Sequence, residues 1–153
     1  MELSDEIYNQ IEVYSEQGNE YCDLEEWEKA VSSFNKAMEL LPEPKEDWEA
    51  STWLYTALGD AFFFAGKYVQ AIESLENARM CPEGMANPFI LLRLGESYYE
   101  QGQMETAKKY LFESYMMEGV EIFAEEDEKY FRLIKDLDPF YNSVSDNKNA
   151  QNG

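Results

Sequence analysis

Residues 55–82 have the sequence YTALGDAFFFAGKYVQAIESLENARMCP, and this stretch decides how the chain folds. Gly59 is followed at fixed spacing by an aromatic residue, by Ala71 and by a large apolar residue, Leu75. Glycine and alanine let two helices approach closely, while large apolar side chains fill the space between neighbouring helices. The stretch therefore predicts two antiparallel helices joined by a tight turn at Gly66.

The same pattern occurs three times along the chain. Its glycines are Gly18, Gly59 and Gly95, which are 41 and 36 residues apart. The other shared positions hold aromatic residues, alanines and large apolar residues, namely Tyr21, Ala30, Phe34, Phe62, Ala71, Leu75, Tyr98, Ala107 and Leu111. The extra residues between the copies, at 42–47 and 81–84, are rich in proline and charge, so they predict connectors.

These spacings follow the pattern W-x2-L-G-x2-Y, A-x3-F and a closing P, so residues 11–121 resemble tetratricopeptide repeats. The copies depart from the pattern at Gln17, which takes the leucine position, and at Ser114 and Gly119, which replace the last alanine and proline. The resemblance implies an all-α fold, a right-handed α-solenoid of three tetratricopeptide hairpins with a C-terminal capping helix.

Six helices are expected from the three copies. We predict them at about 4–21, 25–40, 47–64, 68–79, 88–100 and 104–117. Gly66 and Gly102 predict the tight turns inside the second and third hairpins. Asp23 with Glu26 predicts a capping box at the start of the second helix.

Residues 122–137 begin with acids and end with bases, which complements a helix dipole. They also contain an apolar stripe at helical spacing, Tyr130, Leu133, Ile134 and Leu137. We therefore predict a capping helix at about 125–137. The domain prediction is a single domain over 1–141, with repeats at about 11–44, 52–85 and 88–121, followed by a flexible tail over 142–153.

The chain is strongly acidic, with 12 Lys and Arg against 32 Asp and Glu and a net charge of -20. Nucleic acids and anionic membranes bind through clusters of Lys and Arg, and the longest basic run here is Lys108–Lys109. Both are therefore excluded as partners, and a protein with a basic surface or segment is favoured. The alternative is that the carboxylates only maintain solubility.

Catalysis and cofactors are not expected. The chain has no histidine, and Cys22 and Cys81 lie too far apart in sequence for a zinc or dithiol motif. No phosphate-binding glycine loop, calcium loop or nucleophile with a base is recognisable. Residues 1–6 are acidic and no apolar leader follows them. The sequence thus predicts a cytoplasmic, non-enzymatic protein without metal or cofactor, as a monomer or weak homodimer.

In tetratricopeptide proteins the first helix of each hairpin lines a concave groove that binds the partner. By position, the resemblance places there Glu12, Ser15, Asn19 and Asp23 from the first repeat, Trp53, Thr56, Asp60, Phe63 and Phe64 from the second, and Phe89, Leu92, Glu96, Tyr99 and Glu100 from the third. Aromatic residues among carboxylates can bury apolar groups of a ligand while pairing with its Lys or Arg. The expected partner is therefore basic.

One family role is rejected on the same positions. Tetratricopeptide domains that bind the acidic tails of heat-shock chaperones need two lysines and an arginine in this groove. Here only Asn19 matches, because Asp60 and Glu96 are acidic. An acidic tail would be repelled.

Two roles remain open. The chain's small size and acidity, and its segments 119–123 and 126–130, resemble tetratricopeptide proteins encoded beside bacterial polymorphic toxins. The first hypothesis is thus an immunity-type inhibitor that neutralises a basic toxin. The alternative is a secretion chaperone or assembly adaptor. A chaperone binds an isolated unfolded segment of its client, whereas an inhibitor needs a folded enzyme surface.

Overall fold

The computed structural model describes residues 2–139, and every regular element in that range is a helix. The α-helices are α1 (Asp5–Asp23), α2 (Trp27–Glu39), α3 (Glu49–Phe64), α4 (Tyr68–Arg79), α5 (Pro88–Glu100), α6 (Met104–Glu118) and α7 (Glu128–Ile134). Short 3₁₀ helices are η1 (Lys45–Asp47), η2 (Val120–Phe123) and η3 (Lys135–Leu137). The first six α-helices begin and end within two residues of their predicted positions, and the all-α prediction is confirmed.

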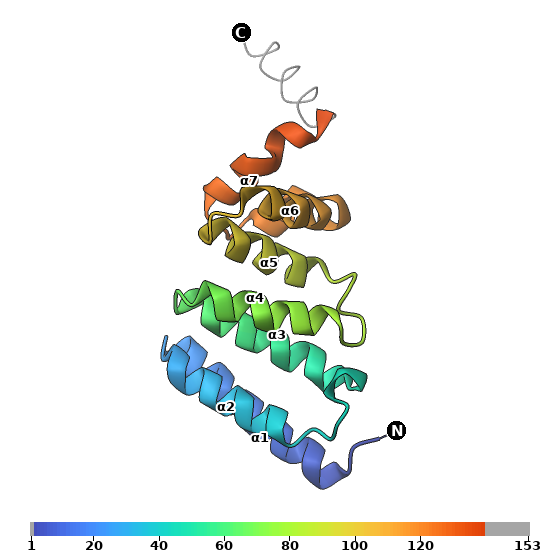
Figure 1. The fold of residues 1–153 in the computed structure, drawn as a ribbon. Helices are drawn as coiled ribbons and strands as arrows, with labels where there is room; N and C mark the ends of the chain where they lie inside the picture. The colour runs from blue at the N-terminus through green and yellow to red at the C-terminus, as the bar shows by residue number, and fades with distance from the viewer. Residues whose placement is uncertain (1, 140–153) are drawn as a thin grey trace.

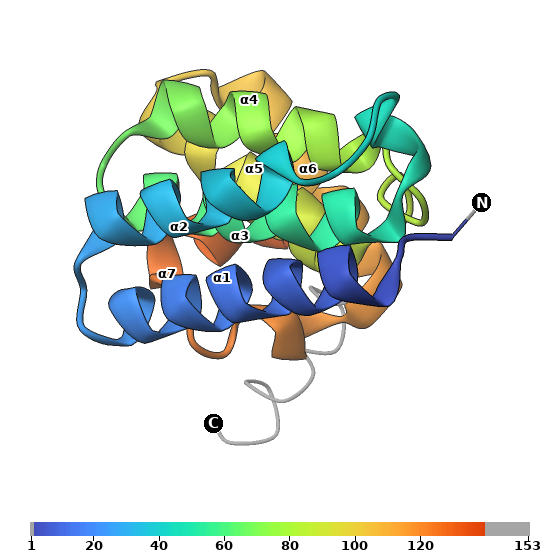
Figure 2. The same cartoon turned by 90° about the horizontal axis from the view of Figure 1, so that it is seen from below.

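The six longer helices form three antiparallel hairpins, α1 with α2, α3 with α4 and α5 with α6, stacked one on another (Figure 1). Neighbouring hairpins contact each other through α2 and α3 and through α4 and α5. In Figure 2, the view along the stack, α1 and α7 project onto one side of the molecule and α4 onto the opposite side. This arrangement is the predicted α-solenoid.

Each hairpin is held together where its glycine faces the large apolar residue of the pattern. A Cβ atom added at Gly59 would lie only 2.5 Å from Leu75 Cγ. The same overlap occurs in all three hairpins, at the pairs Gly18–Phe34, Gly59–Leu75 and Gly95–Leu111. The repeated glycine is therefore required by the close approach of the paired helices.

The turns inside the hairpins use a left-handed residue. Gly66 and Gly102 have φ angles of 77° and 78°, which confirms their predicted role. Glu25 takes the same position in the first hairpin, with a φ of 58°. The predicted capping box is wrong, because Asp23 is the last residue of α1 and Glu26 caps α2 without a side-chain hydrogen bond.

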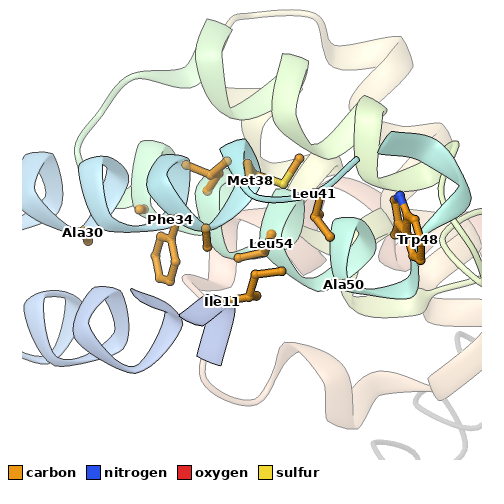
Figure 3. Packing of buried hydrophobic residues seen from close by; sticks show 11 residues of the cluster. Ile11, Ala30, Phe34, Met38, Leu41, Trp48, Ala50 and Leu54 are labelled. Carbon is orange, nitrogen blue, oxygen red and sulfur yellow. The ribbon is translucent and has the colours of Figure 1, made fainter. Parts of the chain in front are cut away.

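The largest buried cluster lies between the first two hairpins (Figure 3). Ile11 from α1, Phe34 from α2 and Leu54 from α3 are almost completely buried there. Trp48 adds its ring at the end of the connector, and its indole N–H donates to the Pro42 carbonyl at 2.8 Å. The connector between the first two repeats therefore continues the core.

The chain after α6 covers the end of the stack with a shorter helix than predicted. The carboxylate of Asp127 caps the start of α7, so the helix begins later than residue 125. Tyr130 and Ile134 are buried as expected, but the chain turns into η3 and leaves Leu137 exposed. The predicted tail, 142–153, lies outside the described residues. Within residues 2–139, no helix is long and apolar enough to cross a membrane.

Candidate functional site

Two hollows lie along α3. One, of about 340 Å³, lies between α1 and α3, and the other, of about 440 Å³, lies between α3 and the connector from α4 to α5. Ala57 and Asp60 line both hollows, so we treat them as one surface, the open groove. Its lining residues are Asn19, Cys22, Asp23, Trp27, Phe34, Glu49, Thr52, Trp53, Thr56, Ala57, Asp60, Ala61, Phe64, Pro82, Glu83 and Asn87.

Taken together, the first helices of the three hairpins are more acidic than the second helices. The first helices, α1, α3 and α5, carry ten Asp or Glu residues and a single base, Arg93. The second helices, α2, α4 and α6, carry seven Asp or Glu residues and five Lys or Arg residues. Three of these acids, Asp23, Glu49 and Asp60, line the open groove, and no Lys or Arg is among its lining residues.

Aromatic side chains lie among these carboxylates. Trp53 is 40% exposed in the larger hollow, and Phe64 is 52% exposed in the smaller one. Phe64 stacks on Trp27, with ring centroids 5.5 Å apart. Exposed rings of this size can be buried by a partner, and such rings often supply much of a protein interface's binding energy.

Arg93 joins three parts of the molecule at one edge of the open groove. Its Nε donates to Asp60 on α3 at 2.9 Å, and its Nη1 donates to Glu96 at 2.6 Å and to Glu126, just before α7, at 2.9 Å. The guanidinium also lies over the ring of Phe64, 4.7 Å from its centroid. The only base of the first helices is thus already neutralised by the chain itself.

Glu96 is completely buried in this cluster. Burial raises the pKa of its carboxyl group to about 9, because the favourable charge of Arg93 does not compensate for the loss of water and the nearby Glu126 carboxylate. The side chain is therefore protonated at neutral pH. One of its oxygens, Oε2, has no hydrogen-bond partner among the described residues.

The residues around α7 cover the part of α5 that follows Arg93. Lys129 lies 5.5 Å from the centre of the Tyr99 ring, and its Nζ pairs with Glu100 at 2.7 Å. The hydroxyl of Tyr130 donates to the same carboxylate at 2.6 Å. Although burial opposes it, these two bonds lower the pKa of Glu100. We call the covered residues, Glu96, Tyr99 and Glu100, the closed section.

Two models of the tetratricopeptide repeat match this sequence, over residues 9–79 and 90–111, and together cover more than half of the chain. The chain is a tetratricopeptide repeat protein. No curated protein matches the whole-chain sequence.

Solved tetratricopeptide structures share its fold. The C-terminal domain of a putative FK506-binding protein from Plasmodium falciparum matches with a TM-score of 0.67 and 17% identity, covering 99% of this chain and 98% of that one. The N-terminal domain of stress-induced protein-1 from C. elegans gives 0.65 and 18%, covering 85% and 98%. The first domain of Spaghetti (RPAP3), bound to the HSP90 peptide SRMEEVD, gives 0.63 and 19%, covering 73% and 82%.

The structure places most predicted groove residues of this tetratricopeptide repeat protein at the surface. Exposed residues are Glu12, Asn19, Asp23, Trp53, Phe64 and Phe89, and half-buried ones are Thr56, Asp60, Phe63, Tyr99 and Glu100. Of these, Glu12 and Phe89 lie outside the two hollows, and Phe63 lies under Arg93. Tyr99 and Glu100 belong to the closed section.

Three predicted groove residues are buried instead, which corrects their assignment. Ser15 donates its hydroxyl to the Ile11 carbonyl at 2.8 Å inside the first hairpin. Leu92 packs in the cluster that also contains Phe123, and Glu96 pairs with Arg93. Leu92 and Glu96 lie on α5, which the chain after α6 covers, whereas Ser15 on α1 is buried within its own hairpin.

The sequence prediction also missed part of the open groove. Glu83 and Asn87 lie in the connector between α4 and α5, and Glu49 lies at the start of α3. The family pattern assigns groove positions only within the first helices, from Trp53 onward on α3, and none in the connectors. The surplus residues at 81–84 were the available signal, because added residues beside a groove can form one of its walls.

Proposed function

We propose that this tetratricopeptide repeat protein is a non-enzymatic binding module whose open groove binds a basic segment of a partner protein. The charge of the groove supports the proposal, because four carboxylates line it, Asp23, Glu49, Asp60 and Glu83, and none of its lining residues is Lys or Arg. Opposite charge on a partner accelerates association and selects against acidic competitors. The exposed rings of Trp53 and Phe64 then bury apolar parts of the same segment.

The expected ligand differs in charge from the one bound by the RPAP3 domain. The HSP90 peptide in that complex, SRMEEVD, is acidic towards its end. The open groove presents Asp23, Glu49, Asp60 and Glu83 to a ligand, so a peptide of that composition is repelled. We therefore assign the opposite charge to the partner of this chain.

For the biological role, we favour an immunity-type inhibitor of a basic toxin over a secretion chaperone or adaptor. The closed section removes much of the third repeat from the groove, because Lys129 and Tyr130 cover it. The remaining open groove suits a short basic loop on a folded protein. A long extended client, as a chaperone holds, would need the groove of all three repeats.

The proposal is tested with a fluorescein-labelled peptide in which lysine and arginine alternate with glycine and serine. We expect fluorescence anisotropy to show binding that weakens about tenfold between low salt and about 0.3 M NaCl, since ionic screening shortens the range of the attraction. The double variant Asp23→Lys, Glu49→Lys should lower the affinity further. Both carboxylates line the open groove.

The matched control is Glu39→Lys with Glu73→Lys, on α2 and α4, which makes the same change in net charge at exposed positions outside the groove. Equal losses in both double variants would mean that only net charge matters and would sink the groove proposal. Once a partner is in hand, its folded and urea-unfolded forms separate the two roles. An inhibitor binds only the folded form, whereas a chaperone retains the unfolded one.

A further inference from the structure

Three cations of the chain are held in the same way. Arg93 lies 4.7 Å from the centre of the Phe64 ring while pairing with Asp60 at 2.9 Å. Lys129 lies over the ring of Tyr99 while pairing with a carboxylate, and Arg79 does the same on α4, over the ring of Tyr110. In each case a cation rests on an aromatic face and a carboxylate fixes its direction.

The larger hollow of the open groove has the same two components, but none of its own lining residues supplies a cation. Trp53 forms part of its surface and is 40% exposed. Three carboxylate side chains line the hollow with it: Asp60, which already pairs with Arg93, and Glu49 and Glu83, which form no ion pair within the described residues. None of its nine lining residues is Lys or Arg. We call this hollow the Trp53 pocket.

The walls of the Trp53 pocket are held in place before any ligand arrives. The hydroxyl of Thr52 donates to the Pro82 carbonyl at 2.8 Å and so ties α3 to the connector. Within the connector, Gly84 packs so closely on α4 that a Cβ there would overlap the Ala78 carbonyl. Asn87 caps the start of α5 through its side-chain oxygen. A ligand therefore enters a formed pocket and little ordering is required.

We propose that the Trp53 pocket takes one lysine or arginine side chain of the partner segment. The alkyl part of that side chain lies along Trp53, and its charged end lies among Glu49, Asp60 and Glu83. This inference rests on the proposed function, because the side chain belongs to the basic segment in the open groove. To the proposed function, the inference adds the binding position, which is the Trp53 pocket, and the residue type bound there, which is lysine or arginine.

The pocket is tested first with small probes, N-acetyl-lysine methylamide and its uncharged norleucine analogue. The indole N–H signals of ¹⁵N-labelled protein report on the three tryptophans, Trp27, Trp48 and Trp53. We expect the lysine probe to shift the Trp53 signal and the norleucine probe to leave it unchanged. Equal shifts from both probes, or a lysine-induced shift confined to Trp27, would overturn the assignment.

The second test uses the labelled basic peptide and two pairs of variants. Trp53→Leu and Glu83→Gln should each weaken binding by about three- to tenfold, since each removes one partner of the cation. The controls are Tyr8→Leu, an exposed ring on α1 outside the pocket, and Glu73→Gln on α4. Both controls should bind as the unchanged protein does.

The two proposals fail in different ways. If the peptide binds the unchanged protein, and Trp53→Leu and Glu83→Gln do not weaken it, then the pocket assignment is overturned and the proposed function stands. If the peptide does not bind the unchanged protein even at low salt, the proposed function itself fails. Melting temperatures of all four variants verify that they are folded.

Discussion

The open groove and the closed section are made of the same kinds of side chain and differ in what occupies them. In the closed section, Lys129 rests on Tyr99 and pairs with Glu100 at 2.7 Å. In the open groove, Asp60 already pairs with Arg93, whereas Glu49 and Glu83 beside Trp53 form no such pair within the described part of the chain. The comparison shows that the first helices build a surface suited to cations. The chain occupies that surface with Lys129 at the end of the stack and with Arg93 at Asp60, and leaves it open beside Trp53.

The last hairpin of a stack needs a covering segment. A terminal hairpin exposes an apolar edge, which a capping segment must cover. Here Phe123, Tyr130 and Ile134 bury themselves against the last hairpin. The polar contacts of Glu126 and Lys129 with α5 follow from that docking, because both residues flank the buried ones. The open groove lies between hairpins that already cover each other.

The largest loss of stability is expected for Arg93→Met. The change removes the cation shared by Asp60, Glu96 and Glu126 and leaves buried carboxyl groups without their partner. We expect the free energy of unfolding, measured with urea, to fall by about 3 kcal/mol. Arg132→Met, which removes a highly exposed ion pair on α7, is the control and should cost less than about 0.5 kcal/mol. Equal effects would contradict the cluster's role.

The second prediction concerns how the free energy of unfolding depends on pH. The pKa of Glu96 is raised to about 9 in the folded protein, so the unfolded chain binds fewer protons between its ordinary pKa and that value. Stability should therefore fall as pH rises, by about 1 kcal/mol per unit between about pH 6 and pH 8.5. No histidine titrates in this range.

In Glu96→Gln the same series of urea unfolding curves should show almost no slope, because the amide does not titrate. Glu49→Gln, in the open groove, should keep the slope of the unchanged protein, since it leaves the contacts of Glu96 with Arg93 in place. A slope that survives in Glu96→Gln would show that another group carries the pH dependence.

A matched pair of aromatic variants compares the two sections directly. Tyr130→Phe removes the hydroxyl that donates to Glu100 at 2.6 Å and should cost about 1 kcal/mol in the free energy of unfolding. Trp53→Phe should leave stability nearly unchanged, because its ring is partly exposed and makes none of the closed section's contacts. For the affinity of the basic peptide we expect the opposite order, with a larger loss in Trp53→Phe than in Tyr130→Phe. If Trp53→Phe lowers the free energy of unfolding more than Tyr130→Phe does, the claim that the closed section stabilises the fold and the open groove does not is contradicted.

The smallest effect on stability is expected for Lys129→Gln. Its side chain is partly exposed, so loss of the pair with Glu100 should cost about 0.5 kcal/mol. The change leaves Tyr99 and Glu100 without their cation, which makes the closed section resemble the open groove. Titration with N-acetyl-lysine methylamide should then show a second set of shifts, near Tyr99. Shifts limited to Trp53 would mean that α7 still blocks access.

Much of the fold could be predicted because the repeat is local. The spacing from Gly59 to Leu75 lies within one hairpin, so the close approach it requires is encoded in consecutive residues. The turn at Gly66 was predictable for the same reason. The left-handed turn at Glu25 was missed, because a glutamate carries no signal for a positive φ and the surrounding hairpin imposes it.

The candidate site could be predicted only in part. The helical register was right at Asp23, Trp53 and Asp60, which line the open groove as expected from their positions. The register could not show that Glu96 is buried. Arg93 pairs with both Glu96 and Glu126, and Glu126 lies thirty residues after Glu96 in the chain. Nor could the register show that Glu83 forms a wall, because the connector's path depends on a hydrogen bond to Thr52.

The sequence by itself therefore determined the three hairpins and the acidic character of the first helices, because both are properties of residues close together in the chain. The tertiary structure decided which part of that acidic face is open. Whether a carboxylate meets solvent, a ligand or the chain's own cation depends on where the segment after the repeats docks. That docking is a contact between residues distant in sequence, and no local spacing encodes it.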